Sequence, residues 1–218
     1  MVRRTREGAE RTRKAVLDAA VRVFLERGVA RASLEEIARV ASVTRGAVYW
    51  HFRDKLDLFL AIDACAYLPA EELLAKLAAY TGPDPLGELA RALDEALADL
   101  EADADRRRLL TVVLVRCEYT EEMAPVLDRQ RRADEALRTA FRRVFERAST
   151  LPAPHGLSPP WTPATAALAL YALLIGMVHS WLRSDLEGGF SLAETGGEAV
   201  RAFLASVGAA SSDERRTR

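Results

Sequence analysis

The residues best suited to chemistry lie between Ser33 and Lys55, in the segment SLEEIARVASVTRGAVYWHFRDK. Hydroxyl, guanidinium, phenol, indole, imidazole and ammonium groups lie there beside an apolar seam. Such groups bind phosphate oxygens, which position a protein on DNA, or base edges, which carry sequence information. We predict that eight residues of this segment contact DNA: Ser33, Thr44, Arg45, Gly46, Tyr49, Trp50, His51 and Lys55.

Two short helices joined by a tight turn must position these groups. Ser33 is a suitable N-cap of the first helix, and Glu36 three residues later would complete a capping box. Thr44 is the natural cap of the second helix, in which Val48 and Phe52 share an apolar face. Because helices this short are unstable alone in water, the pattern predicts a helix-turn-helix whose second helix enters the DNA major groove. A helical corner whose aromatic residues belong to the core is the alternative.

Different residues of this segment suit different parts of DNA. Arg45 is best suited to a bidentate contact with a guanine edge, and Gly46 would let the backbone approach the DNA closely. Trp50 could equally be half-buried in the protein. Lys55 follows the cap Asp54 at the start of the next helix, where the helix dipole does not favour an ammonium. We therefore expect Lys55 to bind an external phosphate, as we do for the other polar residues of the segment.

Charge is distributed unevenly along the 218 residues, half of which are hydrophobic. The net charge of −1 alone argues against binding to nucleic acid. Residues 1–60, however, contain thirteen Lys or Arg and eight Asp or Glu, whereas the remaining residues contain eighteen and twenty-four. A basic N-terminal module on an acidic body is expected when only one end meets DNA.

The number and spacing of the cysteines and histidines, together with the length of the apolar runs, indicate a cytoplasmic protein without a cofactor. Cys65 and Cys117 suggest no disulfide framework, and the three histidines show no metal-ligand spacing. MVRRTREG at the N-terminus lacks the apolar stretch of a signal peptide. The most apolar run, 166–178, is too short to span a bilayer and predicts a buried helix. We therefore expect no cofactor, no metal and no membrane.

Helix signals without a credible strand continue beyond residue 55, which predicts an all-α protein of about nine helices. The expected helices cover about 55–80, 84–102, 105–118, 121–149, 163–184 and 191–207. Residues 151–163 contain five of the nine prolines and form a connector. We expect a three-helix domain over 1–55, a ligand-binding and dimerisation domain over 56–208, and a disordered tail over 209–218.

The chain resembles the TetR (tetracycline-repressor-like) regulators in RASLEEIARVASVTRGAVYWHFRDKLDLF and in the preceding RKAVLDAAVRVFLERGV. Shorter motifs are similar to the branch that controls multidrug efflux pumps: MVRRT, DPLG at 84–87, RRRLL at 106–110 and RCEYTEEM at 116–123. One residue departs from the pattern, because relatives usually have glycine in place of Ser42. A left-handed conformation there would cost a non-glycine residue about 1–2 kcal/mol.

The resemblance implies an apolar cavity for chemically varied compounds in the middle helices. Apolar stripes of this kind usually form plain core, which is the alternative. Relatives often carry polar side chains at several of these positions, so we expect a more hydrophobic pocket. Its predicted lining is Tyr67, Leu93, Ala96, Leu110, Leu114, Cys117, Leu137, Phe141, Tyr171, Leu174, Ile175 and Val178.

The last two helices are the predicted dimer surface. Small residues repeat every four positions in the first of them, which lets another helix approach closely, and the resemblance implies a two-fold four-helix interface. The alternative is that this stripe packs inside one subunit. The predicted interface residues are Ala172, Gly176, Ser180, Val200, Phe203 and Leu204.

Together these features predict a homodimeric repressor that binds double-stranded operator DNA and is released by a hydrophobic small-molecule inducer. An efflux-pump operon is the target that the resemblance implies. Regulation of a metabolic or other transport operon in response to a metabolite is the nearest alternative, and activation is another. A helical assembly protein that binds protein rather than DNA is less favoured, and an enzyme is disfavoured because catalytic and phosphate-binding motifs are missing.

Overall fold

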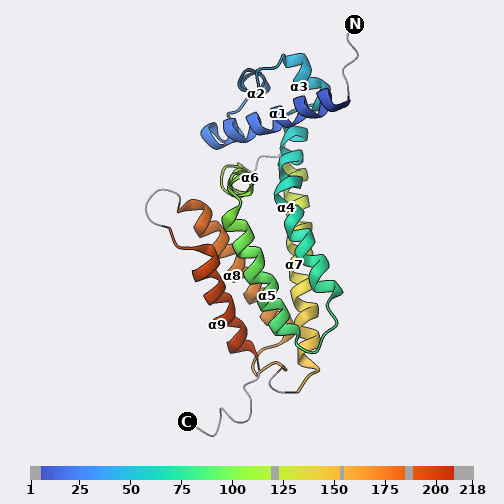
Figure 1. The fold of residues 1–218 in the computed structure, drawn as a ribbon, viewed down its shortest axis with the longest axis vertical. Coiled ribbons are helices and arrows are strands. Elements are labelled where there is room, and N and C mark those ends of the chain that lie inside the picture. The colour runs from blue at the N-terminus through green and yellow to red at the C-terminus, as the bar shows by residue number, and fades with distance from the viewer. Residues whose placement is uncertain (1–5, 119–122, 153–154, 185–188, 209–218) are drawn as a thin grey trace. The chain divides into compact units, whose positions relative to one another are not determined.

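The computed structural model describes residues 6–118, 123–152, 155–184 and 189–208, without the side chains of 67–69. Its regular elements are helices, which confirms the predicted all-α class, and one isolated antiparallel bridge joins Leu157 to Gly208. In chain order (Figure 1) they are α1 (Arg6–Arg27), α2 (Leu34–Val40), α3 (Arg45–His51), α4 (Lys55–Ala79), α5 (Pro85–Ala102), α6 (Ala104–Leu114), α7 (Ala124–Ser149), α8 (Pro163–Arg183), a π-helical turn η2 (Leu192–Gly196) and α9 (Gly197–Val207).

The chain forms two compact units. The first contains Met1–Tyr67 and Asp105–Arg129, and the second contains Leu68–Ala104 and Gln130–Arg218. The first unit therefore extends beyond the 1–55 domain expected from the sequence, because it includes the start of α4, nearly all of α6 and the first turns of α7. The predicted tail 209–218 lies outside the described residues.

The first unit has an aromatic and aliphatic core beneath α1, α2 and α3, which contact one another. The rings of Phe24 and Phe59 lie 6.1 Å apart within it. Ile37 of α2 and Val48 of α3 are fully buried, so each short helix is stabilised by one apolar face. Gly28 follows the end of α1, with a φ of +78° that glycine adopts without strain.

Helix α6 ends four residues earlier than the sequence predicted. The backbone N–H groups of Val115 and Arg116 both donate to the carbonyl of Thr111, at 3.0 Å, and this shared acceptor closes the helix. Arg116 in turn accepts a hydrogen bond from the N–H of Val29, at 3.3 Å. Cys117 therefore does not continue the helical stripe of Leu110 and Leu114, because a tertiary contact with the α1–α2 connector competes with the helix.

Ser42, in the turn between α2 and α3, adopts a left-handed conformation with a φ of +54°. Its N–H donates to the carbonyl of Arg39 at 3.2 Å, and Val43 donates to Ala38 at 3.0 Å. These bonds hold the turn in the geometry that glycine accepts more readily. The domain therefore accepts the cost of a left-handed conformation at Ser42, which the difference from glycine in related sequences had suggested.

Replacing Ser42 with glycine is expected to stabilise the protein by about 0.5–1 kcal/mol. Relief of the left-handed strain gains about 1–2 kcal/mol, and the greater freedom of glycine in the unfolded chain offsets about half of it. Urea unfolding at fixed protein concentration measures the change. Ser42→Ala is the matched control and should not stabilise the protein; stabilisation by alanine as large as by glycine would contradict the strain argument.

In the second unit, α5, α8 and α9 lie side by side (Figure 1) and α9 contacts both of the others. Val200 and Leu204 of α9 are buried, and Arg201 pairs with Asp94 of α5 at 2.8 Å. The Glu101 carboxylate accepts hydrogen bonds from the backbone of Leu192 and Ala193, at 3.0 and 2.9 Å. The Glu101 carboxylate thus pairs with backbone N–H groups at the start of η2, which have no partner within the helix itself.

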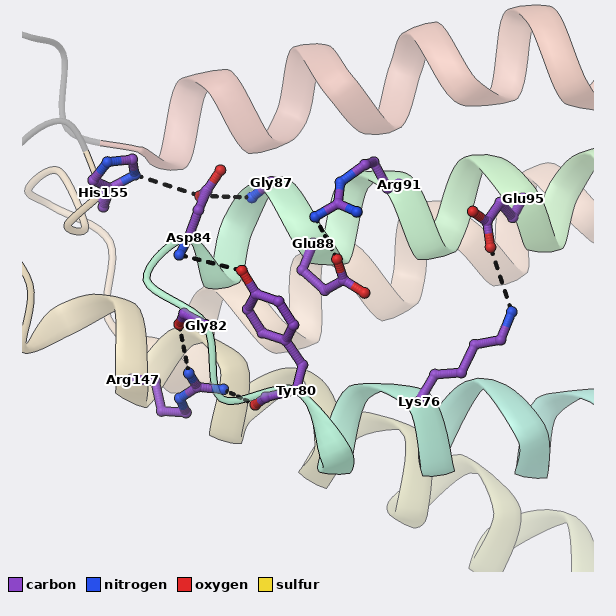
Figure 2. A network of polar contacts seen from close by, with 10 residues as sticks. All are labelled: Lys76, Tyr80, Gly82, Asp84, Gly87, Glu88, Arg91, Glu95, Arg147 and His155. Atoms are coloured by element: carbon purple, nitrogen blue, oxygen red, sulfur yellow. Dashed lines mark hydrogen bonds and ion pairs between the residues drawn. The ribbon is translucent and has the colours of Figure 1, made fainter.

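A polar network fixes the turn between α4 and α5 (Figure 2). Asp84 caps α5 by accepting from the N–H of Gly87 at 2.9 Å. The Arg147 guanidinium, from α7, donates to the carbonyl of Tyr80 and to that of Gly82, the latter at 3.0 Å, and lies over the Tyr80 ring. The end of α4 is thereby tied to α7.

Helix α8 is long and apolar enough to cross a membrane by length and composition, with a mean hydropathy of 1.6 over its most apolar window. The helix extends beyond the uninterrupted apolar run 166–178 and is therefore longer than that run predicts. Core helices of soluble proteins have the same properties. Ala166, Leu170 and Leu174 of α8 are buried in the second unit, although only 33% of the apolar window is buried in all.

Candidate nucleic-acid interface

Both helices of the helix-turn-helix begin with the predicted caps. The Ser33 hydroxyl accepts from the N–H of Glu36 at 3.2 Å, and the Thr44 hydroxyl accepts from the N–H of Ala47 at 3.1 Å. The Glu36 carboxylate pairs with Arg27, at 3.2 Å. It thus ties α2 to the end of α1, a contact that differs from the capping box suggested by the spacing.

Helix α3 buries one side and exposes the other. Ala47 and Val48 are buried against the core, whereas Tyr49 is 43% and Trp50 is 66% exposed. Thr44, Arg45 and Gly46 are also exposed at the start of the helix. An indole as exposed as that of Trp50 contributes little to the core, so the half-buried alternative for this residue does not hold in the free protein.

Arg45 is held in place by two neighbours in the absence of DNA. Its guanidinium lies 2.8 Å from Glu35 of α2 and donates to the Tyr49 hydroxyl at 3.2 Å. It also lies over the Tyr49 ring, 5.2 Å from the centroid. The Tyr49 hydrogen bond, followed by Glu35, raises the pKa of Arg45. The side chain is therefore a cation at any physiological pH and is oriented by α2 before it meets a ligand.

Glu35, the ion-pair partner of Arg45, was not among the residues predicted from the sequence. Ten residues across a turn separate it from Arg45, so no helical periodicity connects them. A carboxylate in this position would compete with DNA for the guanidinium if Arg45 contacts a base, as predicted. An ion pair at an exposed site contributes little stability. Arg45 can therefore give up its contact with Glu35 and contact a base edge instead.

Lys55 has an internal role in addition to the predicted external one. Its ammonium donates to the carbonyls of Ala30 and Ala32, at 2.9 and 3.3 Å. These bonds join the start of α4 to the connector before α2. They also offset the unfavourable interaction of the ammonium with the positive end of the helix dipole. An ammonium has three donors, so one remains for a phosphate.

The space around Gly46 does not require glycine for packing. A Cβ built there would meet a single atom within 4 Å, the Thr44 hydroxyl oxygen at 4.0 Å. The open space is consistent with the predicted close approach of the DNA backbone at this position. His51, also in the predicted set, is half-buried and its ring packs edge-on against Trp50, 4.5 Å between centroids.

A buried ion pair, not predicted from the sequence, links α4 to α7 inside the first unit. Asp63 is fully buried and its carboxylate contacts the Arg129 guanidinium, which is 34% exposed. Burial, with contributions from Asp63 and Glu118, raises the pKa of the nearby Cys117 thiol to about 11. Cys117 therefore stays a neutral thiol at physiological pH and is not activated as a nucleophile.

The predicted ligand-binding residues divide between the two units. Tyr67, Leu110, Leu114 and Cys117 belong to the first unit, and the other eight belong to the second. Leu93, Leu110, Phe141 and Leu174 are buried, and the side chain of Tyr67 lies outside the described part. The remaining seven are half-buried: Ala96, Leu114, Cys117, Leu137, Tyr171, Ile175 and Val178.

Tyr171 is the polar group with the most altered environment in this set. Burial, followed by a hydrogen bond with Asp134, raises its pKa to about 12. The Arg138 guanidinium lies over its ring, 5.6 Å from the centroid. The phenol therefore remains protonated, and its contacts with Asp134 and Arg138 join α8 to α7.

A half-open groove of about 800 Å³ lies between α4 and α7 in the second unit. It contains none of the twelve predicted ligand-binding residues. Small alanines and aliphatic side chains form much of its surface, together with Thr139, Arg143 and Arg147. Among the described residues, no group of three or more His, Cys, Asp or Glu side chains is placed to hold a metal ion.

The predicted dimer residues fall into two groups. Ala172, Gly176 and Ser180 are exposed along α8, and a Cβ built on Gly176 meets no atom within 4 Å. Leu168, one turn earlier, is 55% exposed. This stripe does not pack inside the subunit, so the alternative assignment is wrong for it and the surface is available to a second copy.

Val200 and Leu204 are a correction to the predicted interface. They are 0% and 6% exposed, because α9 turns its apolar face towards α5 and α8 of its own unit. Phe203 is half-buried, with its ring 5.5 Å from that of Trp161. The exposed side of α9 carries Arg201, Ala202, Ala205 and Ser206.

Family models match both parts of the chain. Residues 16–62 match the model described as bacterial regulatory proteins, tetR family. Residues 84–207 match the model of the MAATS-type transcriptional repressor, C-terminal region. The first match covers the capped helices of the helix-turn-helix, and the second covers α5 to α9.

Individual relatives match over nearly the whole chain. The HTH-type transcriptional repressor BepR of Brucella suis biovar 1 (strain 1330) is 40% identical over 209 residues, 94% of this chain and 96% of BepR. NalD, the secondary repressor of the MexAB-OprM multidrug efflux pump in Pseudomonas aeruginosa, has 35% identity and a TM-score of 0.79, covering 93% of this chain and 98% of its own. A complex of SmeT with triclosan has 29% identity and a TM-score of 0.76, covering 91% and 92%. The chain therefore belongs to the TetR family of bacterial regulatory proteins and carries the C-terminal region of the MAATS-type transcriptional repressors.

Proposed function

We propose that the protein is a cytoplasmic, homodimeric transcriptional repressor that binds a pseudo-palindromic operator and releases it when a hydrophobic small molecule binds the helical body. The regulated genes encode a multidrug efflux pump. The observation that carries the proposal is the exposed face of α3, where Arg45, Tyr49 and Trp50 lie beside one another on a helix with a buried opposite face. NalD, similar over nearly the whole chain, represses such a pump.

Each predicted DNA contact has a defined role on this surface. Arg45 contacts a guanine edge, for which a guanidinium is best suited. The hydroxyls of Ser33 and Thr44 and the ammonium of Lys55 contact phosphates, which position the protein without selecting a sequence. Gly46 leaves room for the DNA backbone. Two copies joined through the exposed stripe of α8 present two such helices to successive major grooves, about 34–36 Å apart.

Release requires that the inducer bind two conformations with different affinity. The first unit contains both the DNA-binding helices and nearly all of α6, and Arg116 beyond α6 is hydrogen-bonded to Val29 before α2. A compound that displaces Leu110 or Leu114 of α6 therefore acts on the same compact unit as α3. The complex of SmeT with triclosan supports a ligand of this hydrophobic kind. Coupling between such sites is typically about 1–3 kcal/mol.

A regulator of a metabolic operon that responds to a metabolite remains the nearest alternative. Its operator binding would be the same, because the DNA-binding surface is independent of the ligand. An assembly protein that contacts protein through α3 would not discriminate between DNA sequences. The family to which the chain belongs consists of transcriptional regulators, and no catalytic role is needed to explain its features.

Binding to DNA from upstream of its own gene is expected to exceed binding to scrambled DNA by about a thousandfold or more. Affinity should fall steeply with salt, because each phosphate contact releases condensed counterions. Fluorescence anisotropy with labelled DNA measures both quantities. Addition of triclosan as the hydrophobic probe should weaken operator binding by about five- to 150-fold.

The controls separate the parts of this proposal. Scrambled DNA of equal length tests sequence specificity, and glucose, a polar compound, tests the demand for a hydrophobic ligand. Equal affinity for both DNAs would contradict the repressor assignment. Light scattering at micromolar concentration tests the dimer, and a monomer would contradict recognition of a two-fold operator.

A further inference from the structure

The α4–α7 groove described above has the size of a small-molecule site. Its volume of about 800 Å³ falls within the range of about 300–1,000 Å³ that such sites occupy. The space exists because four alanines, Ala75 and Ala78 of α4 and Ala136 and Ala140 of α7, line it. Methyl groups leave open the volume that leucine side chains would fill between two packed helices.

The charged side chains that line the groove are all positive. Arg143 and Arg147 are the charged side chains that line it, and no acidic side chain does so. The Arg147 guanidinium is already fixed by the carbonyls of Tyr80 and Gly82 (Figure 2), which are neutral acceptors and leave its charge uncompensated. An anion is therefore the ligand whose charge this groove complements.

Arg143 is free to bind such an anion. It is exposed and has no hydrogen-bond or ion-pair partner within the described part of the chain. Its neighbour Arg142 pairs with Glu146 at 3.4 Å and does not line the groove. An unpaired guanidinium offers the planar, two-pronged donor geometry that a carboxylate accepts.

The arrangement along α7 separates the apolar part of the groove from the charged part. Ala136, Ala140, Arg143 and Arg147 follow at intervals of three or four residues and so lie on one face of the helix. Seven residues from Ala136 to Arg143 correspond to about 10 Å along the axis. The groove can thus hold an extended apolar chain over the alanines with an acidic group at Arg143.

We propose that the α4–α7 groove binds a carboxylate carried on an unbranched apolar chain of medium length. The Arg143 guanidinium binds the carboxylate, with Arg147 adding positive charge beside it, and the chain lies on the alanine-lined floor. This site shares no residue with the predicted inducer pocket and requires no DNA. If the groove binds no such carboxylate, the proposed repressor function is unaffected. If the protein is not a repressor, the proposal for the groove is unaffected.

Isothermal titration of the full-length protein with decanoate tests the proposal. Decanoate should bind, decan-1-ol should bind at least about tenfold more weakly, and decyltrimethylammonium should show no binding, because the charge contact is lost or reversed. Arg143→Ala should weaken decanoate about ten- to a hundredfold, as expected for a hydrogen bond to a charged group. Arg142→Ala, the matched control, should change the Kd less than twofold.

Filling the groove tests its location. Ala140→Phe should abolish decanoate binding, and Ala136→Leu serves the same purpose if the larger side chain prevents folding. Three outcomes would overturn the proposal: no decanoate binding at millimolar concentration, equal binding of decan-1-ol, or an unchanged Kd in the groove-filling variant. Circular dichroism of each variant shows that the helices remain folded.

Discussion

Replacing Arg45 with alanine is expected to weaken operator binding by about 1–3 kcal/mol and to remove the preference for one base position in each half-site. The bidentate contact of a guanidinium with a guanine edge is lost, whereas the phosphate contacts of Ser33, Thr44 and Lys55 remain. Affinity for scrambled DNA should therefore change much less than affinity for the operator. Anisotropy titrations against a set of single-base operator variants measure both effects.

A matched control for this experiment is Arg22→Ala. Arg22 is an exposed arginine of α1 in the same unit, with its guanidinium bonded to the Asp18 carbonyl, so the variant removes the same charge without altering α3. It should leave the base preference intact. Operator binding by the Arg45 variant with unchanged affinity and unchanged base preference would exclude Arg45 as a base contact.

Replacing Arg129 with methionine is expected to lower the free energy of unfolding by about 3 kcal/mol, the lower end of the range for breaking a buried ion pair. Asp63 is fully buried, so loss of the guanidinium removes a neighbouring positive charge from a carboxylate in a low-dielectric site. Methionine keeps most of the aliphatic stem of arginine, so packing changes little. Urea unfolding at fixed protein concentration measures the loss.

Two further variants distinguish charge from packing at this pair. Asp63→Asn in the Arg129→Met background removes the buried charge and should recover part of the lost stability. Arg132→Met, at an exposed position of the same helix, should change stability by less than about 0.5 kcal/mol. Two results would show that the ion pair is not the cause. One is a double variant with the same free energy of unfolding as Arg129→Met, and the other is an Arg132→Met variant that loses as much stability as Arg129→Met.

Local patterns in the sequence predicted what depends on neighbours along the chain. Ser33, Thr44, Asp84, Thr162 and Ser191 each cap a helix in the structure. A cap satisfies backbone donors within three residues, so the sequence holds all of the information it requires. The left-handed turn at Ser42 was suggested only by the resemblance, because relatives usually have glycine there, and the structure decided between a strained turn and an altered one.

Contacts between distant segments were not predictable in this way. Lys55 binds carbonyls more than twenty residues away, and α6 stops where Arg116 meets Val29. The apolar stripe of α9 gave no indication of whether Val200 and Leu204 face their own subunit or another, because both arrangements need the same amphipathic helix. The predicted inducer pocket has the same ambiguity, since pocket and core share one residue pattern, and it remains a prediction.

The sequence by itself determined the helical class and the capped helix-turn-helix, because these depend on periodicity and short-range hydrogen bonds, and its motifs indicated the family by resemblance; the exposure of Trp50 came from the structure. Only the tertiary structure decided the Glu35 partner of Arg45, the buried Asp63–Arg129 pair, the exposed stripe of α8 and the alanine-lined groove between α4 and α7. The physical reason is that a pattern shows which face of a helix is apolar, whereas the partner of that face depends on which segments, remote in the chain, pack against it.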